Sequence, residues 1–412
     1  MNRTQVGIIG AGPAGLILAL LLTREGVDSV VLEMRDRQYV ENRVRAGHIE
    51  EGVVETLGEV GEDSRLRREG FHQSSFEVRA GGERHHVPVT ELTDGVGTWM
   101  YSQKELLKDL LRGAERCDAS VVFDAPAIGI DGAETRRPII HYVHEGKSKT
   151  LACDVVVGCD GSCSMARSAI PARALQHCSH SYPFSWLGIL VDAPPVTTEE
   201  LIYVHHPEGF AMHSFRSKSL TRLYLQTWSR ERPEQWSEED IWRKLHSRFR
   251  VDGEWSLNEG KIMQRADVQL RTLVISPLRY GHLFLAGDAA HVVPPTAAKG
   301  LNLAVADARM LAPSLADYLR RGDNAGVDSY SERSLEEVWN AVAFSMEMTN
   351  VFHAFPDDCF QAGLQESRLA RLCSSPQYAR TFCEMYAGLS RLRRDTSSDL
   401  HGSQPLINRE VV

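Results

Sequence analysis

The chain has 412 residues, of which 42% are hydrophobic and 25% are charged, as in an ordinary globular protein. This length is sufficient for two packed domains, each with a sizeable core. The formal net charge is −9 at neutral pH, so no basic field argues for nucleic acid or an anionic membrane as a partner.

The cysteine pattern argues against a metal or redox site. None of the eight cysteines belongs to a Cys-x-x-Cys pair, which excludes zinc-ribbon and thioredoxin-like motifs. Cys153, Cys159 and Cys163 cluster loosely without a nearby histidine, so we expect no bound metal. Free thiols indicate a reducing compartment, and the apolar run at residues 16–22 is too short to cross a bilayer. The sequence therefore predicts a cytoplasmic protein.

The N-terminal segment carries a dinucleotide-binding pattern, in which an apolar strand and an apolar helix flank GAGPAG at residues 10–15. In such a turn, Gly10 permits a tight bend, Gly12 lets a pyrophosphate approach the backbone, and Gly15 allows close helix–strand packing. A second strand ends at Glu33, where a carboxylate can hold a ribose hydroxyl. The alternative is a glycine-rich turn of any α/β protein, but the flanking elements favour a Rossmann-type half.

Two further strands each end in an acid beside a glycine. One ends in Gly287-Asp288, after which two prolines force an extended turn before a helix opens near Lys299. The other ends in Asp160-Gly161. Open α/β sheets bind ligands at the carboxyl ends of their strands, so both carboxylates are candidates for contact with a polyol. Taken alone, the first segment is also compatible with an ordinary strand–turn–helix corner.

The predicted elements describe an α/β fold with a discontinuous cofactor domain. An aromatic, β-rich stretch interrupts that domain and is typical of a separate antiparallel sheet that covers a site, where small-molecule ligands commonly bind. The predicted parts are residues 1–75, 101–175 and 273–310 for the cofactor domain, 76–100 for a β-rich insertion, 176–272 for the substrate sheet, and 311–412 for C-terminal helices.

The three acid-and-glycine segments together resemble the group A flavoprotein aromatic hydroxylases, and further segments are similar to the members of that family that hydroxylate 4-hydroxybenzoate. The likeness covers nearly the whole chain and keeps the order and spacing of the motifs. It implies a Rossmann-type, glutathione-reductase-like FAD-binding domain with an inserted antiparallel β-sheet. The further segments are residues 43–47 (RVRAG), 182–188 (YPFSWLG), 201–207 (LIYVHHP), 294–304 (PPTAAKGLNLA) and 386–389 (YAGL).

The resemblance implies FAD as cofactor, NADPH or NADH as electron donor, and O2 as co-substrate that forms a flavin C4a-hydroperoxide. It places two arginines near the pyrophosphate, with which guanidinium groups pair bidentately. Outside this framework the same arginines would be interpreted as a solvated charge run. The implied FAD-binding residues are Gly10, Gly12, Ala14, Gly15, Glu33, Arg43, Arg45, Gln103, Asp160, Asp288 and Leu301.

The resemblance also implies a site for a small aromatic acid. Arg216, with Ser214 and Tyr224, would bind the carboxylate and orient the ring. Tyr203 would hydrogen-bond the 4-hydroxyl group, and Tyr386 would extend this chain of donors. Without the resemblance, both tyrosines would be interpreted as core residues with partnered hydroxyls. The backbone of Pro295 and Asn302 would set the local polarity, and Arg222 would stabilise the reduced flavin.

The sequence departs from the family pattern at three positions. Gln73 stands where a proton-relay histidine is expected, and glutamine cannot carry a proton at neutral pH. The relay could run through His72, run through water, or serve a modified substrate. Met34 replaces an arginine that favours NADPH, although Arg35, Arg37 and Tyr39 stand nearby. Cys163 replaces a histidine that assists binding of the nicotinamide nucleotide, whereas Arg271 is retained, so the choice between NADPH and NADH stays open.

The leading hypothesis is an FAD-dependent monooxygenase that converts 4-hydroxybenzoate into 3,4-dihydroxybenzoate. The alternative is a hydroxylase of an amino- or otherwise substituted 4-hydroxybenzoate in secondary metabolism, which the Gln73 departure motivates. A flavin-binding protein without hydroxylase activity would keep the glycine turn but leave the tyrosine–arginine set unexplained. Nothing specific in the sequence supports a flavin-dependent halogenase. The resemblance further implies a homodimer, with neither nucleic acid nor membrane as a partner.

Overall fold

The first sheet forms the nucleotide-binding half of the protein. The structure, a computed structural model, describes residues 2–43, 47–197, 200–228, 231–253 and 255–389. Five strands run parallel in the order β18-β11-β1-β2-β8, and the antiparallel strand β17 flanks β18. These strands are β1 (Asn2–Ile9), β2 (Ser29–Leu32), β8 (Ser120–Val122), β11 (Lys147–Gly158), β17 (Arg279–Tyr280) and β18 (Leu283–Leu285), with β9 (Ala127–Asp131) and β10 (Ile139–His144) as an antiparallel extension of β11.

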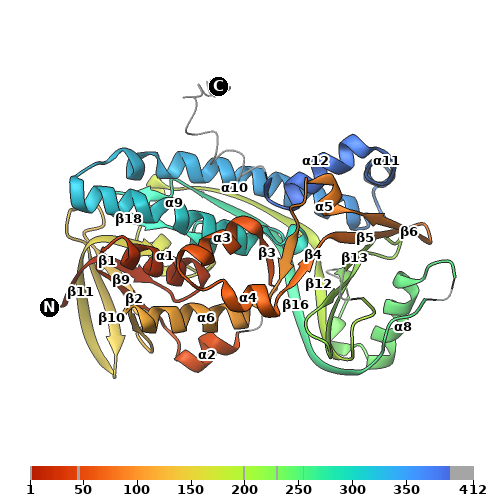
Figure 1. Ribbon diagram of the computed structural model, residues 1–412, viewed down its shortest axis with the longest axis horizontal. Helices are drawn as coiled ribbons and strands as arrows, with labels where there is room; N and C mark the ends of the chain where they lie inside the picture. The colour runs from red at the N-terminus through yellow and green to blue at the C-terminus, as the bar shows by residue number, and fades with distance from the viewer. Residues whose placement is uncertain (1, 44–46, 198–199, 229–230, 254, 390–412) are drawn as a thin grey trace.

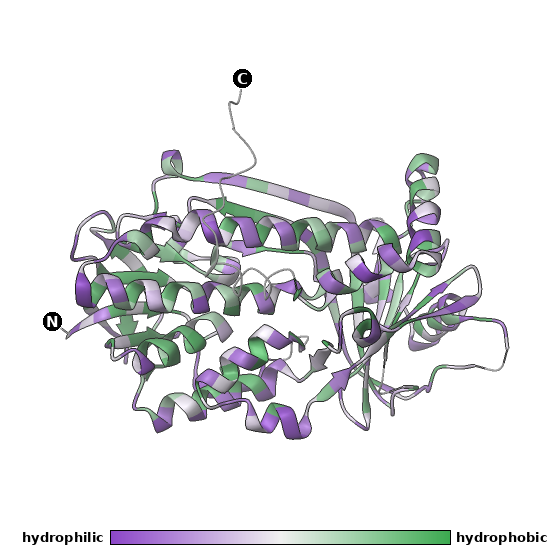
Figure 2. Cartoon of the chain, turned by 45° about the horizontal axis from the view of Figure 1, so that its top comes forward, coloured by the Kyte–Doolittle hydropathy of each residue, from purple (hydrophilic) through white to green (hydrophobic). Residues whose placement is uncertain are grey.

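Helices cover this sheet because its strands are apolar on both faces, as in doubly wound folds. Helix α1 (Pro13–Arg24) is apolar nearly all round and packs against α6 (Gln103–Arg116) and α9 (Lys299–Arg321). Figure 2 shows hydrophobic residues concentrated on the strands of this half, whereas the outer helices carry hydrophobic and hydrophilic residues in alternation. The predicted Rossmann-type half is confirmed. Shorter helices at its margins are α2 (Arg37–Asn42), α3 (Glu51–Glu59), α4 (Ser64–Glu69), α7 (Met165–Ser168) and η1 (Ala172–Ala174).

The second sheet has eight strands in the order β19-β16-β12-β15-β14-β13-β5-β6. All neighbours are antiparallel except β13 and β5. Two strands from the predicted insertion therefore complete the substrate sheet, because β5 pairs with the otherwise open edge of β13. The strands are β5 (Ser75–Ala80), β6 (Glu83–Val87), β12 (Gln176–Asp192), β13 (Glu200–Val204), β14 (Ala211–Phe215), β15 (Leu220–Trp228), β16 (Lys261–Ser276) and β19 (His291–Val292).

A small antiparallel sheet lies between the two halves, in the centre of Figure 1. It consists of β3 (His48–Glu50), β7 (Thr98–Met100) and β4 (Phe71–Gln73), with β7 in the middle. Helix α9 contacts β3, so this small sheet joins the nucleotide-binding half to the site region.

The C-terminal third is helical, as predicted, and helix α10 runs along both halves (Figure 1). Helix α12 packs on the short helix α5, which brings the end of the described chain to the second sheet. Within the described residues, no helix has the length and apolar character needed to cross a membrane. The remaining elements are α5 (Val89–Leu92), α8 (Glu238–Phe249), α10 (Ala325–Phe352), α11 (Cys359–Ser374), α12 (Pro376–Tyr386), η2 (Pro233–Gln235), η3 (Gly287–Ala289) and η4 (Pro295–Ala297).

Candidate functional site

The glycine turn between β1 and α1 has the shape of a phosphate cradle. Gly10 has φ +105°, and a Cβ there would meet the carbonyl oxygen of Cys159 at 2.4 Å. A Cβ on Gly15 would lie 2.0 Å from the Gly10 carbonyl oxygen, so only glycine allows the helix to start so close to the strand. A Cβ on Gly12 would meet nothing within 4 Å, and no side chain caps α1. The helix N-terminus is thus open to an anion, which fits the pyrophosphate of a dinucleotide.

Glu33 is buried at the end of β2 and is held by two backbone amides. The amide of Ala11 donates to Oε2 at 2.7 Å, and the amide of Arg35 donates to Oε1 at 2.9 Å. A carboxylate offers about four acceptor positions, so two remain for a ribose hydroxyl.

The two acid-and-glycine segments lie at the ends of the neighbouring strands β11 and β18. Asp160 accepts from the hydroxyl of Ser164 at 2.5 Å and from the amide of Ala166 at 3.0 Å, which fixes its carboxylate at the start of α7. Gly287, at φ +62°, donates its amide to the buried Asp307 at 2.8 Å. Asp288 follows in η3 and is half-buried.

The remaining predicted cofactor residues occupy the edges of the same half. Arg43 directly follows α2, and Gln103 begins α6 with a buried side chain. Ala14 is buried in the first turn of α1, and Leu301 lies in the first turn of α9. Arg45 lies outside the described residues.

The second sheet holds a group of cationic and hydroxyl side chains, in which Arg222, Ser214 and Tyr224 are buried and Arg216 is half-buried. Arg216, just after β14, donates to the Ser214 hydroxyl at 2.6 Å and to the Tyr224 hydroxyl at 3.4 Å. Arg222, on β15, lies 5.4 Å from the centre of the Tyr224 ring. A Cβ on Gly188 would lie 2.6 Å from the Nη2 atom of Arg222. The Arg222 guanidinium therefore fits at this position because residue 188 is glycine.

Both guanidiniums lack an acidic partner among the residues that the structure describes. Within the described parts of the chain, Arg216 and Arg222 form no ion pair with a carboxylate. Burial lowers the pKa of Arg216, although the Tyr224 hydroxyl opposes this effect. A cation that is buried, as in Arg222, or half-buried, as in Arg216, is costly without a counter-charge, so this group is suited to receive an anion from outside the chain.

Two buried tyrosines form a second polar group, made from β13 and the end of α12. Tyr203 stacks on Phe352 at 5.1 Å between ring centres, and Phe76 contacts both Tyr203 and Tyr386. Burial raises the pKa of Tyr203 to about 12, an effect that the Tyr386 hydroxyl opposes and Tyr224 reinforces. Burial and the Tyr203 hydroxyl also raise the pKa of Tyr386. Tyr203 and Tyr224 are both paired with Met212, so they lie on the same face of the second sheet.

The turn before α9 brings Pro295 and Asn302 to the same region. The Pro295 carbonyl accepts from the amide of Ala298 at 3.0 Å. The Asn302 side chain accepts from the amide of Glu50 at 3.0 Å and donates to the Ala298 carbonyl at 3.0 Å. This amide thus ties α9 to β3 and holds the first turn of the helix against the small sheet.

Lys299 is a functional candidate that the sequence reasoning missed. Its ammonium group is buried and donates to Glu50 at 2.5 Å and to the carbonyls of Met385 at 2.7 Å and Tyr386 at 3.0 Å. Glu50 lies 249 positions from Lys299 in the sequence, and Met385 lies 86 positions away. No local sequence pattern could therefore reveal these contacts.

The two candidates for a relay residue at β4 lie on opposite faces of that strand. Gln73 is buried, whereas His72 is exposed and contacts Trp99 edge-on at 5.0 Å. Successive side chains of a strand alternate between faces, so His72 points away from the side that Gln73 occupies. A relay through His72 is therefore disfavoured.

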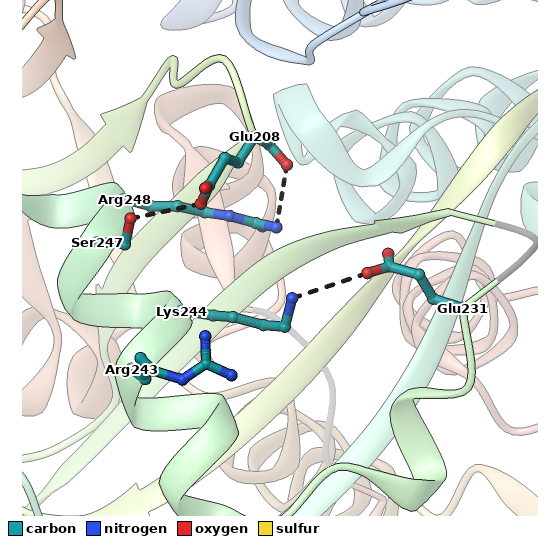
Figure 3. A pocket seen from close by; sticks show the side chains of 6 residues that line it. All are labelled: Glu208, Glu231, Arg243, Lys244, Ser247 and Arg248. Carbon is teal, nitrogen blue, oxygen red and sulfur yellow. Dashed lines mark hydrogen bonds and ion pairs between the residues drawn. The ribbon is translucent and has the colours of Figure 1, made fainter.

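A separate polar pocket beside α8 contains none of the predicted site residues. Figure 3 shows an ion pair between Lys244 and Glu231 at 3.8 Å, and hydrogen bonds from Ser247 and Arg248 to Glu208. Arg243 pairs with Asp240, and Arg248 donates to three backbone carbonyls, so the cationic groups of this pocket already have partners within the protein. The pocket is therefore a weaker candidate than the arginine–tyrosine group. Its lining residues are Glu208, Glu231, Arg243, Lys244, Ser247 and Arg248.

A dinucleotide-type glycine turn in one half, together with a group of arginine and tyrosine side chains in the other, is typical of a flavin-type oxidoreductase that acts on aromatic compounds. A family model described as an FAD binding domain matches residues 3–345. The chain belongs to this FAD-binding monooxygenase family and is an FAD-dependent aromatic hydroxylase that uses NAD(P)H and O2.

Individual relatives support this assignment. A p-hydroxybenzoate hydroxylase of Acinetobacter baylyi (strain ATCC 33305 / BD413 / ADP1) is 36% identical over 388 residues, covering 94% of this chain and 96% of that protein. A 3-(3-hydroxy-phenyl)propionate/3-hydroxycinnamic acid hydroxylase of Escherichia coli O139:H28 is 25% identical, covering 93% of this chain and 68% of that protein.

Solved structures share the fold. The p-nitrophenol 4-monooxygenase of Pseudomonas putida DLL-E4 superposes with a TM-score of 0.78 at 21% identity, covering 94% of this chain and 99% of that chain. Aklavinone-11 hydroxylase, solved with FAD and aklavinone, gives a TM-score of 0.72 at 23% identity, covering 86% and 70% of the two chains. The predicted α/β fold with an antiparallel substrate sheet and C-terminal helices is confirmed.

Proposed function

We propose that this enzyme hydroxylates 4-hydroxybenzoate at the 3-position to give 3,4-dihydroxybenzoate. The observation that carries the proposal is the pair of complementary polar groups in one buried region. Arg216 lacks an acidic partner among the described residues and suits a carboxylate, whereas Tyr203 and Tyr386 suit a phenol. A para-hydroxybenzoate presents these two functions at opposite ends of one ring.

At the carboxylate end, the guanidinium of Arg216 would bind both oxygens, since its planar fork matches a carboxylate. Ser214 and Tyr224 already contact Arg216 and can turn their hydroxyls toward the same oxygens. Arg222 adds positive charge beside the Tyr224 ring. This anchoring would fix which ring carbon faces the oxidant, so the protein contributes to the rate by orientation.

At the other end, the Tyr203 hydroxyl would hydrogen-bond the 4-hydroxyl group and Tyr386 would continue the chain of donors. Drawing the proton from the phenol makes the ortho carbon electron-rich and thus a better nucleophile. The backbone carbonyl of Pro295 and the backbone amide of Asn302 would set the polarity beside that carbon. Bound FAD, reduced by NADPH or NADH, supplies the activated oxygen atom.

The cofactor would be held by the residues of the nucleotide-binding half. The turn at residues 10–15 suits the pyrophosphate, Glu33 a ribose, and Asp160 and Asp288 the polyol chain. Arg43, Gln103 and Leu301 would complete the contacts, as would Arg45. Met34 and Cys163 are exposed, so they are accessible to a nicotinamide nucleotide, and the preference between NADH and NADPH is a property to be measured.

Product analysis tests the proposal. The FAD-loaded enzyme, given NADH or NADPH with 4-hydroxybenzoate, should accumulate 3,4-dihydroxybenzoate. Tyr203→Phe should lower product yield and raise hydrogen peroxide, because the phenol loses its hydrogen-bond partner. Tyr142→Phe, at a buried tyrosine on β10 of the first sheet, is the matched control and should behave as wild type. Rapid NAD(P)H oxidation that yields only hydrogen peroxide with wild type would overturn the substrate assignment.

A ring-substituted 4-hydroxybenzoate is the second candidate substrate. The observation that favours it is Gln73, whose buried amide places hydrogen-bonding capacity where the family pattern has a titratable group. A side-by-side panel of 4-hydroxybenzoate and its amino-substituted analogues decides between them. A product yield per NAD(P)H that is several-fold higher with an amino-substituted ring would select the second candidate.

A further inference from the structure

The small sheet between the two halves presents a row of buried polar side chains toward the tyrosines. Glu50 on β3 is paired with Thr98 on the central strand β7, and Thr98 is paired in turn with Gln73 on β4. Directly opposed residues of neighbouring strands lie on one face, and residues two apart in a strand share that face. His48, two residues before Glu50, therefore belongs to the same face as Gln73.

The polar atoms of this face are not satisfied by the protein. Both ring nitrogens of His48, both amide atoms of Gln73 and the hydroxyl of Thr98 are buried and have no hydrogen-bond partner among the residues that the structure describes. The Tyr386 hydroxyl likewise forms no hydrogen bond of normal geometry with a described residue. Buried polar groups are nearly always hydrogen-bonded. Several buried polar groups without partners on one face therefore indicate side chains that change their hydrogen-bond partners during function.

His48 is the member of this row that contacts the tyrosine pair. Its ring meets that of Tyr386 edge-on, with 5.1 Å between ring centres and an interplanar angle of 65°. Its backbone carbonyl accepts from the Asn302 side chain at 3.4 Å, so β3 is fixed against α9 at this residue. Among the unpartnered side chains of the row, which are those of His48, Gln73 and Thr98, only the imidazole is a base that can take up a proton and release it again.

We propose that His48 takes the place of the missing relay histidine at position 73 and carries the phenolic proton of the substrate out of the site through Tyr386. This inference rests on the proposed function, since it requires a phenolic substrate at Tyr203. The 4-hydroxyl proton passes to the Tyr203 oxygen as Tyr203 gives its own proton to Tyr386. Tyr386 in turn gives its proton to a ring nitrogen of His48. The products are a bound phenolate and an imidazolium, which then releases the proton to water.

The surroundings of His48 keep the imidazolium short-lived. Burial, together with the ammonium of Lys299 on α9, lowers the pKa of His48 to about 4, and Glu50 on β3 opposes both effects. The groups from the other elements are the Tyr386 phenol on α12 and the neutral side chains of β4 and β7. His48 is therefore neutral and ready to accept at physiological pH, and it acts through Tyr386 rather than on the substrate.

The experiment measures proton movement rather than turnover. The FAD-loaded, oxidised enzyme is mixed with 4-hydroxybenzoate in a stopped-flow instrument across a range of pH. The ultraviolet difference spectrum reports the bound phenolate, and a pH-indicator dye reports released protons. We expect His48→Val to slow both signals by about tenfold or more, because an acid–base residue typically contributes at least that much. The affinity for 4-hydroxybenzoate measured at low pH should change by less than about threefold, since no contact to the substrate is lost.

Two further variants keep the result interpretable. His48→Gln preserves polarity and approximate size without a titratable group, so it should be as slow as His48→Val even if the valine variant folds poorly. Adding Gln73→His to His48→Val should recover most of the rate by returning a histidine to the same face. His72→Val, on the opposite face, is the matched control and should match wild type.

The outcomes separate this inference from the proposed function. A wild-type enzyme that neither binds nor hydroxylates 4-hydroxybenzoate contradicts the proposed function. A wild-type enzyme that forms phenolate at the same rate as both folded His48 variants contradicts the relay alone.

Discussion

The nucleotide end and the ring end of this enzyme are built in different ways. The nucleotide end uses one turn at residues 10–15 with Glu33, and its contacts form mainly within neighbouring strands. The ring end joins β3, β13, α9 and α12, whose contacts link residues far apart in the sequence, such as Lys299 and Glu50 at a separation of 249 positions. A local turn can thus be recognised from its own residues, whereas an assembled site depends on every element that converges on it.

Breaking the ion pair at the ring end should have the largest effect. Lys299→Met removes an ammonium that is buried with Glu50 and bonded to two carbonyls near the end of α12. Leaving one member of a buried pair without its partner costs about 3–5 kcal/mol of unfolding free energy. Urea unfolding of the FAD-loaded protein, followed by circular dichroism, measures this loss.

Two variants serve as controls for that measurement. Lys149→Met breaks an exposed pair with Glu145 at 3.4 Å and should cost less than about 1 kcal/mol. Combining Lys299→Met with Glu50→Gln removes both charges and should cost less than Lys299→Met alone. Equal losses for the exposed and the buried lysine would refute the idea that this pair joins the ring end together.

His48 should make the ring end sensitive to acid. Its pKa in the folded protein is about 4, below the ordinary value of 6.5, so the unfolded chain binds more protons between these two pH values. Stability from this residue is complete above pH 6.5 and is lost as the pH falls toward 4, by up to about 3 kcal/mol. Unfolding free energy measured against pH should therefore fall less steeply in His48→Val than in wild type. His213 and His353 also have pKa values lowered to about 3 by burial, and their contribution cancels in this difference. Parallel pH profiles for the two proteins would contradict the assignment.

The nucleotide end was predictable from sequence because each residue acts on its neighbours. Gly10, Gly12 and Gly15 lie where the pattern predicts, and the strand ending at Glu33 delivers its carboxylate to the turn. The parallel sheet, the inserted antiparallel sheet and the C-terminal helices also follow from periodicity and turn residues, and the structure confirms them.

The ring end was predictable only through family resemblance, and then only at positions that keep the pattern. The structure does bring Ser214, Arg216 and Tyr224 together, and it places Tyr203 near Tyr386. No periodicity reveals that β5 pairs with β13 across more than a hundred residues, because strand pairing depends on the whole sheet. For the same reason, no sequence pattern links His48 to Tyr386.

Removing the guanidinium at the carboxylate end should weaken binding without unfolding the protein. Arg216→Met should raise the dissociation constant for 4-hydroxybenzoate about 100-fold, since two charge-assisted hydrogen bonds are lost. Titration of flavin absorbance with the ligand measures this change. Arg243→Met, which breaks an exposed pair with Asp240, should leave affinity unchanged. 4-Methylphenol lacks the carboxylate, so its affinity should differ little between Arg216→Met and wild type. A similar loss for both ligands would mean that Arg216 shapes the site without binding the carboxylate.

At the nucleotide end, a single methyl group should separate cofactor binding from folding. Gly12 has φ −76° and ψ −179°, which alanine adopts readily, and its added Cβ would meet no protein atom within 4 Å. Gly12→Ala should therefore keep the unfolding free energy of the FAD-free protein within about 1 kcal/mol of wild type. The methyl group would occupy space that the pyrophosphate needs against the backbone, so FAD affinity should fall about tenfold or more. Gly129→Ala on β9 also places its Cβ in open space and should change neither quantity. The added Cβ at Gly12 would meet open space, whereas Lys299 bonds to protein segments far apart in the sequence. Equal destabilisation of the FAD-free protein by Gly12→Ala and Lys299→Met would therefore contradict the distinction between a local turn and an assembled site.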